Sequence, residues 1–152
     1  MTLEVDLHIN DHSNPAPDLA LFQKWVATAI AASDQPLTNN TTVSIVVTNK
    51  SHSAELNLSF RQKEGPTNVL SFPDTPIPGG NDTHLGDIIL CNPVVVEEAE
   101  KQGIPTMDHW AHLTIHGILH LLGYDHINDD EALIMERIEI DALSQLNIAS
   151  PY

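Results

Sequence analysis

At 152 residues with 41% hydrophobic content, the chain is long enough for one domain with its own core and too short for two, so we expect a single domain over residues 1–152. A formal net charge of -15, from six lysines and arginines against twenty-one acids, works against long-range attraction to nucleic acid or to anionic membranes. One cysteine and no apolar run of about 18 residues exclude a disulfide framework and a membrane-spanning helix, and predict a soluble, cytoplasmic protein.

Sequence patterns divide the chain into predicted strands and helices. Period-two alternation or β-branched runs predict strands over residues 3–9, 42–48, 68–72 and 85–90. Apolar residues at helical spacing predict helices over residues 18–32, 92–102 and 106–122 and after Asn128, and Leu56 with Phe60 predicts a short helix that ends near Arg61. This order predicts an α+β (mixed α/β) fold, with a central four-stranded sheet packed by about five helices and the histidine-bearing helix central.

Particular residues mark the expected ends of these elements. Asn92, which precedes a proline, and Thr106 are predicted N-caps, and Asn128 with Glu131 has the spacing of a capping box. The segment 73–80 is rich in proline and glycine, which predicts a mobile loop at the rim of the site. The last helix is expected to bury an apolar stripe at Met135, Ile138, Ala142 and Leu146.

The stretch from residue 108 to residue 126 contains five of the nine histidines. Four of them lie at helical spacing and form one stripe of one helix, at His109, His112, His116 and His120. Gly123 is expected to end this helix in the left-handed conformation, so that the following turn brings His126 back to the end of the stripe. We therefore expect His116, His120 and His126 to converge on one point. His109 is interpreted as an ordinary buried histidine, and His112 as the same or as a group that lines the site.

Three imidazoles in the spacing H-x3-H-x5-H are typical of a catalytic zinc site, which keeps its fourth position for water. We therefore expect one Zn²⁺ per chain. In zinc peptidases with the motif H-E-x-x-H, the glutamate after the first histidine is the general base. Gly117 occupies that position here, which argues against a peptidase of that design. A structural zinc would need a fourth protein ligand, for which His84, Asp87 and Asp125 are candidates.

Three blocks of the sequence resemble the YbeY family, bacterial metal-dependent endoribonucleases of ribosomal RNA maturation. They are HGILHLLGYDH at residues 116–126, the segment 56–73, and LGDII at residues 85–89, in family order. The resemblance implies a mixed α/β fold, zinc on His116, His120 and His126, and cleavage of single-stranded RNA in 3'-end maturation of small-subunit rRNA and in ribosome quality control. It also implies contacts with a small-subunit ribosomal protein and, as a further candidate, a ribosome-assembly GTPase, with no DNA or membrane partner.

Arg61 is one of six basic residues and lies in the second of these blocks. Cleavage of a phosphodiester develops negative charge on phosphoryl oxygens, and a guanidinium can hold two of them. We therefore predict that Arg61 holds the scissile phosphate, the alternative being a surface ion pair. Lys63 could line the same rim. Asp87 and Asp125 could orient ligands, accept a proton or merely cap turns, and Cys91 is expected to be buried.

Two other functions remain open from the sequence. One is a zinc hydrolase that acts on a substrate other than RNA, because the histidines indicate an activated water without naming its target. The other is a non-enzymatic ribosome-assembly factor with a structural zinc. The acidity of the chain predicts that an RNA-cleaving protein of this sequence binds free RNA weakly and in a salt-sensitive way.

Overall fold

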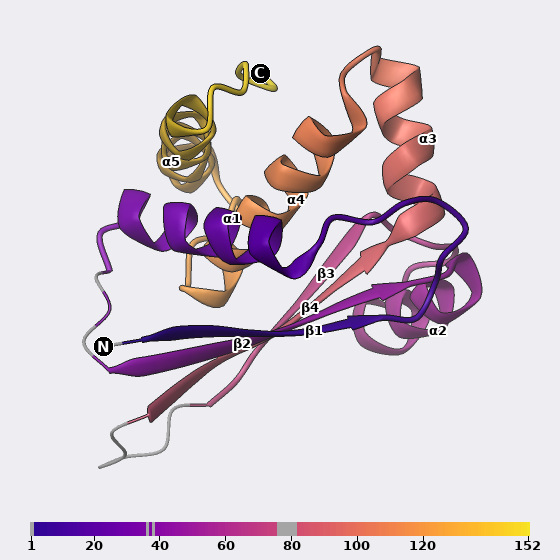
Figure 1. Ribbon diagram of the computed structural model, residues 1–152, viewed down its shortest axis with the longest axis horizontal. Coiled ribbons are helices and arrows are strands. Elements are labelled where there is room, and N and C mark those ends of the chain that lie inside the picture. Colours follow the sequence, from indigo (N-terminus) through magenta and orange to yellow (C-terminus); the bar gives the residue numbers. More distant parts are fainter. Residues whose placement is uncertain (1, 36, 38, 76–81) are drawn as a thin grey trace.

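The computed structural model describes residues 2–35, 37, 39–75 and 82–152 (Figure 1). Its strands are β1 (Leu3–Ile9), β2 (Asn40–Thr48), β3 (Val69–Pro73) and β4 (Asp82–Cys91). Its helices are α1 (Leu19–Ala32), α2 (Lys50–Arg61), α3 (Asn92–Gln102), α4 (Thr106–Leu121) and α5 (Asp129–Gln145). The predicted element order and the α+β class are confirmed. None of the helices in the described part of the chain is long and apolar enough to cross a membrane.

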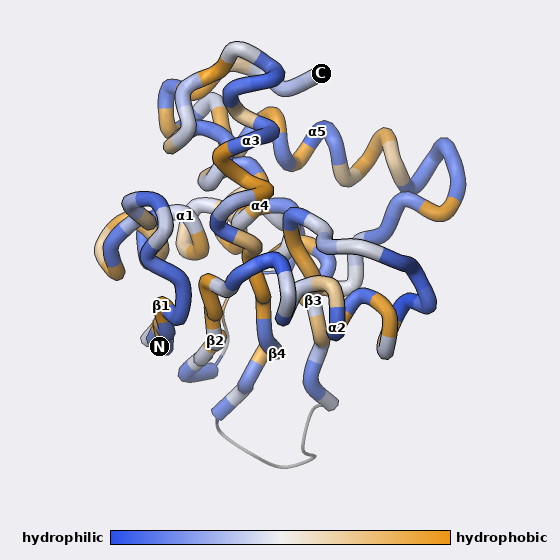
Figure 2. The backbone as a smooth tube through the Cα atoms, turned by 90° about the vertical axis from the view of Figure 1, so that its right-hand side faces the viewer, coloured by the Kyte–Doolittle hydropathy of each residue, from blue (hydrophilic) through white to orange (hydrophobic). Residues whose placement is uncertain are grey.

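The strands form one mixed sheet in the order β1-β2-β4-β3. β1, β2 and β4 are parallel, and β3 pairs with β4 in the antiparallel direction at one edge. Helices α1, α4 and α5 lie over one face of this sheet (Figure 1). Helix α2 follows β2 directly and lies at the carboxyl end of the parallel strands, on the side of β3 (Figure 2). The space between α4, α2 and the β3 edge is where the candidate site is found.

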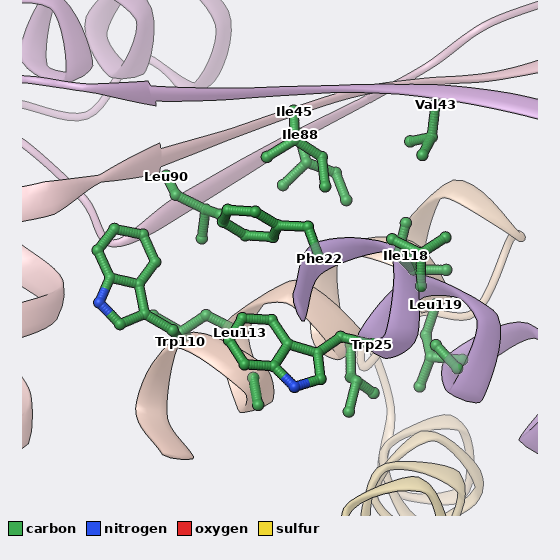
Figure 3. Close-up of a cluster of buried hydrophobic side chains, with 14 of the residues drawn as sticks. Phe22, Trp25, Val43, Ile45, Ile88, Leu90, Trp110, Leu113, Ile118 and Leu119 are labelled. Atoms are coloured by element: carbon green, nitrogen blue, oxygen red, sulfur yellow. The ribbon is translucent and has the colours of Figure 1, made fainter. Parts of the chain in front are cut away.

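The core lies between α1, α4 and the covered face of the sheet. The ring of Phe22 is fully buried and makes edge-to-face contacts with Trp25 and Trp110, at centroid distances of 5.5 and 6.4 Å. Ile45 and Leu90 meet these rings from the sheet (Figure 3). Each such side chain contributes about 1.5 to 3 kcal/mol when fully buried. This packing buries the faces of α4 that meet α1 and the sheet, and His112, His116 and His120 lie on a less buried face.

Gly117 is a point of close approach between α4 and the sheet. A Cβ atom at this position would meet the side chain of Ile88 at 3.1 Å and the Ser71 hydroxyl at 3.2 Å. The Ser71 hydroxyl donates a hydrogen bond to the Gly117 carbonyl at 3.3 Å. The position that holds the general base in H-E-x-x-H peptidases therefore faces the sheet in this protein, and a side chain there would have to displace Ile88 and Ser71.

The end of α4 and the start of α5, which flank the turn that carries His126, are as predicted. Gly123 has φ of +99°, its N–H donates to the His120 carbonyl, and the next N–H, of Tyr124, donates to the Leu119 carbonyl, each at 3.0 Å. These bonds and the positive φ are those of a Schellman motif. Asn128 caps α5 by accepting a hydrogen bond from the Glu131 N–H at 2.9 Å. The chain therefore leaves α4 and enters α5 through short, well-bonded segments.

Two of the predicted N-caps are wrong. Asn92 is the first residue of α3 rather than its cap, and its buried amide donates to the carbonyls of Asp11 and Asn14, at 3.1 and 2.9 Å. The side chain therefore ties the segment after β1 to α3 instead of capping the helix. Thr106 is the first residue of α4 after a cap at Pro105, which has extended backbone and makes no side-chain cap bond.

Some predicted boundaries shift. β2 begins at Asn40 and β4 at Asp82, two and three residues earlier than predicted, because both ends pair with each other in register. Of the predicted rim loop over 73–80, Pro73 belongs to β3, and residues 76–80 lie outside the described residues.

Candidate metal centre

Three histidines come together at the carboxyl end of α4. His116 and His120 lie one turn apart on the helix, and His126 follows the turn at Gly123. Each offers a nitrogen to a group in which all three ligand atoms lie within 4.8 Å of one another. Ring centroids are separated by 4.6 to 5.6 Å. Among the described residues, no fourth imidazole, thiol or carboxylate joins this group, so three protein ligands are available to a metal ion.

The outer nitrogens of the two helical histidines are held by groups that only accept hydrogen bonds. His116 Nδ1 lies 2.5 Å from the carboxylate of Glu139, and His120 Nδ1 lies 3.0 Å from the Tyr124 carbonyl. Each Nδ1 therefore donates its proton outward, and Nε2 is the nitrogen that each ring turns toward the other histidines. Burial, followed by the neighbouring imidazoles, lowers the pKa of His120 and so favours its neutral form.

The distance between the two inner nitrogens tests whether a metal ion fits. His116 Nε2 and His120 Nε2 are 3.0 Å apart. Two imidazole nitrogens on one tetrahedral zinc ion, each about 2.0 to 2.1 Å from it, are roughly 3.3 Å apart. The observed separation is close to the one that a zinc ion needs, and three imidazole nitrogens are a donor set that fits zinc.

Glu139 of α5 is a site residue that the sequence analysis missed. Its side chain is fully buried, and one carboxylate oxygen accepts the hydrogen bond from His116 while the other accepts one from the Tyr152 hydroxyl. Burial by itself would raise the pKa of Glu139, but the imidazoles of His112 and His116 and the Tyr152 hydroxyl lower it to about 2. Glu139 therefore stays ionised and sets the orientation of His116. Carboxylates that accept the free N–H of a metal-binding histidine commonly have this role.

A sequence signal for Glu139 was present. It lies four residues after Met135 and three before Ala142, both of which are buried members of the predicted apolar stripe. An acid in the middle of a buried helical face needs a partner, because an unpaired buried charge is very costly. A buried carboxylate on the last helix and histidines on another buried helix could therefore pair. Neither sequence pattern, however, shows where the partner of the other lies.

Tyr152 is the second residue that the sequence analysis missed. Its hydroxyl donates to Glu139, and its ring lies edge-on to His112 with centroids 5.9 Å apart. Burial and the adjacent Glu139 carboxylate raise the pKa of the Tyr152 hydroxyl, so it remains a donor. Tyr152 follows α5 in a segment without regular structure, where no periodicity could have indicated it.

The remaining two histidines of the stripe differ. His112 is half-buried and lines the same cavity as the three converging histidines. His109 is buried one turn further back, where its Nε2 lies 2.8 Å from the Glu98 carboxylate. Glu98 also accepts a hydrogen bond from Asn68 at 3.0 Å. His109 therefore joins α4 to α3 and β3 and takes no part in the group at the carboxyl end.

A cavity of about 850 Å³ opens beside the three histidines. One wall is formed by α4 and the turn after it, and the other by β3 and the carboxyl end of α2. Arg61 lines this second wall. It is exposed, and no carboxylate of the described residues lies within 4 Å of its guanidinium nitrogens. The structure therefore brings Arg61 to the cavity of the histidines, with its guanidinium available to an anion.

The other residues that the sequence offered as site candidates do not join the group of three histidines. His84 and Asp87 face each other at 3.5 Å on β4 and do not line the cavity, and neither does Lys63. Asp125 lines the cavity, where its carboxylate accepts a hydrogen bond from the His126 N–H at 2.8 Å and so orients that backbone. Cys91 is buried, and burial raises the pKa of its thiol.

Known proteins are similar to this chain in sequence and in fold. A family model described as Endoribonuclease YbeY matches residues 8–147. Proteins named Endoribonuclease YbeY from two strains of Coxiella burnetii, Dugway 5J108-111 and RSA 331 / Henzerling II, are each 43% identical over 152 residues, which is 99% of this chain and 98% of theirs. The solution structure of TM1509 from Thermotoga maritima is similar in fold, with a TM-score of 0.56 at 20% identity over 96% of this chain and 92% of that one. Because the family model and these relatives cover nearly the whole chain, the protein belongs to the YbeY family.

Proposed function

We propose that this protein is a zinc-dependent endoribonuclease that cuts single-stranded RNA, with His116, His120 and His126 as the zinc ligands. Membership of a family described as endoribonucleases supports the reaction class. The observation that carries the metal assignment is the convergence of three imidazoles whose ligand nitrogens lie within 4.8 Å of one another, with the Nδ1 protons of His116 and His120 bound to other groups. Three ligands leave one coordination position open, as catalytic zinc sites do.

A zinc ion held by these three imidazoles would supply Lewis acidity toward a phosphoryl oxygen and toward water. The residues of the chain provide the rest of the arrangement. Glu139 and the Tyr124 carbonyl hold the Nδ1 protons and so keep both helical imidazoles pointed into the cavity. Arg61 binds the scissile phosphate from the opposite wall, because two of its N–H groups can bond two phosphoryl oxygens at once.

The biological substrate that we propose is small-subunit rRNA, in 3'-end maturation and ribosome quality control. With six lysines and arginines in the chain, and Arg61 the only one of them among the residues described as lining the cavity, affinity for free RNA is expected to be low. Because this affinity is low, we expect contacts with other proteins to bring the enzyme to its rRNA substrate. A small-subunit ribosomal protein and a ribosome-assembly GTPase are the partners that we propose, in the cytoplasm.

A ribosome-assembly factor with a structural zinc is less compatible with this geometry. Structural zinc sites are almost always closed by four protein ligands. The group at the end of α4 offers three among the described residues. Of the three candidates for a fourth ligand, His84 and Asp87 do not line its cavity, and Asp125 lines the cavity but does not join the group. A zinc hydrolase that acts on another substrate remains the competing proposal, and the substrate itself decides between the two.

The test is cleavage of a short labelled single-stranded RNA by protein whose zinc content has been measured. Cleavage at about one zinc per chain should be lost in His120→Ala together with the metal. Arg61→Ala should keep its zinc and lose cleavage by about 100-fold or more, since removal of one donor to a developing oxyanion costs roughly 100- to 1,000-fold in rate.

Lys63→Ala is the matched control, because it removes a nearby cation that does not line the cavity. It should cleave like the wild type. An Arg61→Ala variant that cleaves as well as Lys63→Ala would remove Arg61 from the mechanism. A zinc-loaded wild-type protein that cuts no RNA, with or without ribosomal partners, would contradict the proposed function.

A further inference from the structure

Two large aromatic residues that line the cavity are exposed: Tyr152, whose hydroxyl is bound to Glu139, and Phe60, which lies on the wall formed by α2 and β3. Phe60, in the last turn of α2, is 61% exposed and lines the same cavity as Arg61 and the histidines. An isolated exposed apolar residue needs no explanation in a folded protein. A phenyl ring beside a phosphate-binding residue and a metal site is a different case, because its free surface opens on the space that the substrate would fill.

The ring is nevertheless held in place. Phe60 contacts Phe72 of β3 edge-to-face, with centroids 5.0 Å apart and ring planes at 68°. Phe72 is half-buried and also lines the cavity. The two rings thus form a small aromatic shelf, defined here as Phe60 and Phe72, on the wall opposite the histidines. Its geometry is set before any ligand arrives.

The position of α2 does not depend on burial of Phe60. The buried residues of this helix are polar: the Ser53 hydroxyl bonds both the N–H and the carbonyl of Thr67 at 3.0 Å, and the Asn57 amide donates to the Gly65 carbonyl at 2.9 Å. α2 then ends at Gln62, which has φ of +56°. Polar bonds to the loop after the helix therefore anchor it, and its aromatic residue is free for another role.

The charge of the protein indicates what that role is. With a net charge of -15, long-range attraction cannot hold RNA in the cavity. Stacking of bases on aromatic side chains depends little on charge and accepts every base, because each base has a π-face. The wall that carries Arg61 for a phosphate also carries Phe60 as its exposed aromatic surface.

We propose that the exposed ring of Phe60, supported by Phe72, is a stacking subsite for one unpaired base of the RNA whose phosphate is bound by Arg61. This inference rests on the proposed function and adds the contact that recognises the nucleobase. A base can lie on such a shelf only when it is unstacked from its own helix. The shelf therefore accounts for a preference for single strands without reading the sequence.

The experiment measures single-turnover cleavage of a short RNA by zinc-loaded full-length protein over a range of protein concentrations. Phe60→Leu keeps an apolar side chain and removes the π-face. It should raise the protein concentration for half-maximal rate by roughly 10-fold, as expected for loss of one base–aromatic stack. The maximal rate and the zinc content should stay close to those of the wild type, because Phe60 touches neither the histidines nor the phosphate.

Two variants and a modified RNA serve as controls. Phe60→Tyr keeps the ring and should restore wild-type binding. Leu58→Ala removes another exposed apolar side chain of α2, 56% exposed, that does not line the cavity, and it should change nothing. An RNA with an abasic residue at each position in turn should bind the wild type more weakly at one position, and there Phe60→Leu should cause no further loss.

The outcomes separate the two proposals. If the wild type cleaves RNA and Phe60→Leu has the same half-maximal concentration, or weakens every abasic RNA equally, the stacking subsite is wrong and the proposed function stands. If the zinc-loaded wild type neither cleaves nor binds RNA, the proposed function fails and the subsite fails with it.

Discussion

The two walls of the cavity are built in different ways. On the α4 wall, the histidines project from a helix whose other faces are packed in the core, as the fully buried Trp110 and Ile118 show. On the α2 wall, the buried residues of the helix are Ser53 and Asn57, and Phe60 is left exposed. The first wall is held by apolar packing and the second by a few hydrogen bonds.

This difference separates metal binding from substrate binding. Changes in the α4 wall act on residues that are buried and mutually bonded, so they should affect both zinc affinity and the stability of the fold. Changes in the α2 wall should leave the zinc site intact and act on the binding of RNA. The following variants test that separation, from the largest expected effect to the smallest.

The largest effect is expected from Glu139→Ala in α5, which packs behind the α4 wall and bonds His116. It leaves the Nδ1 proton of His116 without its acceptor and opens a space in a buried position. The free energy of unfolding should fall by roughly 3 kcal/mol, from the lost hydrogen bonds and the cavity together. Zinc affinity should fall by about 10- to 100-fold, as found for partners behind metal-binding histidines. Urea denaturation and competition with a chelator measure the two quantities.

Glu139→Gln is the matched control for this change. It keeps the shape and one acceptor oxygen for His116 but removes the charge. Zinc affinity should fall less than in Glu139→Ala, and most of the stability should be retained. Zinc affinity equal to that of the wild type in both variants would show that Glu139 has no part in orienting His116.

A smaller effect is expected from Asn57→Ala in the α2 wall. It removes the hydrogen bond to the Gly65 carbonyl, which should cost about 1 to 2 kcal/mol in the free energy of unfolding. Because α2 then loses part of its anchorage, Phe60 and Arg61 are less well placed and RNA cleavage should fall. Zinc should remain at one per chain. Ser59→Ala, an exposed position of the same helix, is the control, and zinc loss in Asn57→Ala would contradict the separation of the two walls.

The smallest effect is expected from Tyr152→Phe. Only the hydroxyl that donates to Glu139 is removed, while the ring can stay against His112. Zinc affinity should fall by less than in Glu139→Gln, and stability should change by about 1 kcal/mol or less. Isothermal titration with zinc in the presence of a competing chelator would detect this. A larger loss than in Glu139→Gln would mean that Tyr152 contacts the site in another way.

Sequence reasoning worked well for the α4 wall and less well for the α2 wall. The histidine stripe and Gly123 predict a helix that ends where His126 can return, because both features are local. Glu139 meets His116 only through the packing of α5 on α4, which no local pattern contains. Tyr152 lies outside any periodic segment and could not be found in this way.

For α2, the sequence predicted the element but not its buried face. Leu56 and Phe60 at helical spacing indicated the helix, whereas its buried residues are Ser53 and Asn57. The polar groups bond backbone atoms of residues 65 and 67, and such contacts have no periodic signature. The same applies to Asn92, whose amide bonds distant carbonyls where a helix cap was expected.

The turn at Gly123 divides the three predicted zinc ligands into two kinds. His116 and His120 are positioned by the folded helix, so the free energy needed to order them is part of folding and not of zinc binding. His126 lies on an exposed segment outside the helix, and local opening of that segment requires far less free energy than global unfolding. Zinc should therefore exchange through a partly open state in which two ligands remain in place. Amide hydrogen exchange at Asp125 and His126, beyond the bonded Tyr124, should slow on zinc binding, while protection within α4 stays unchanged.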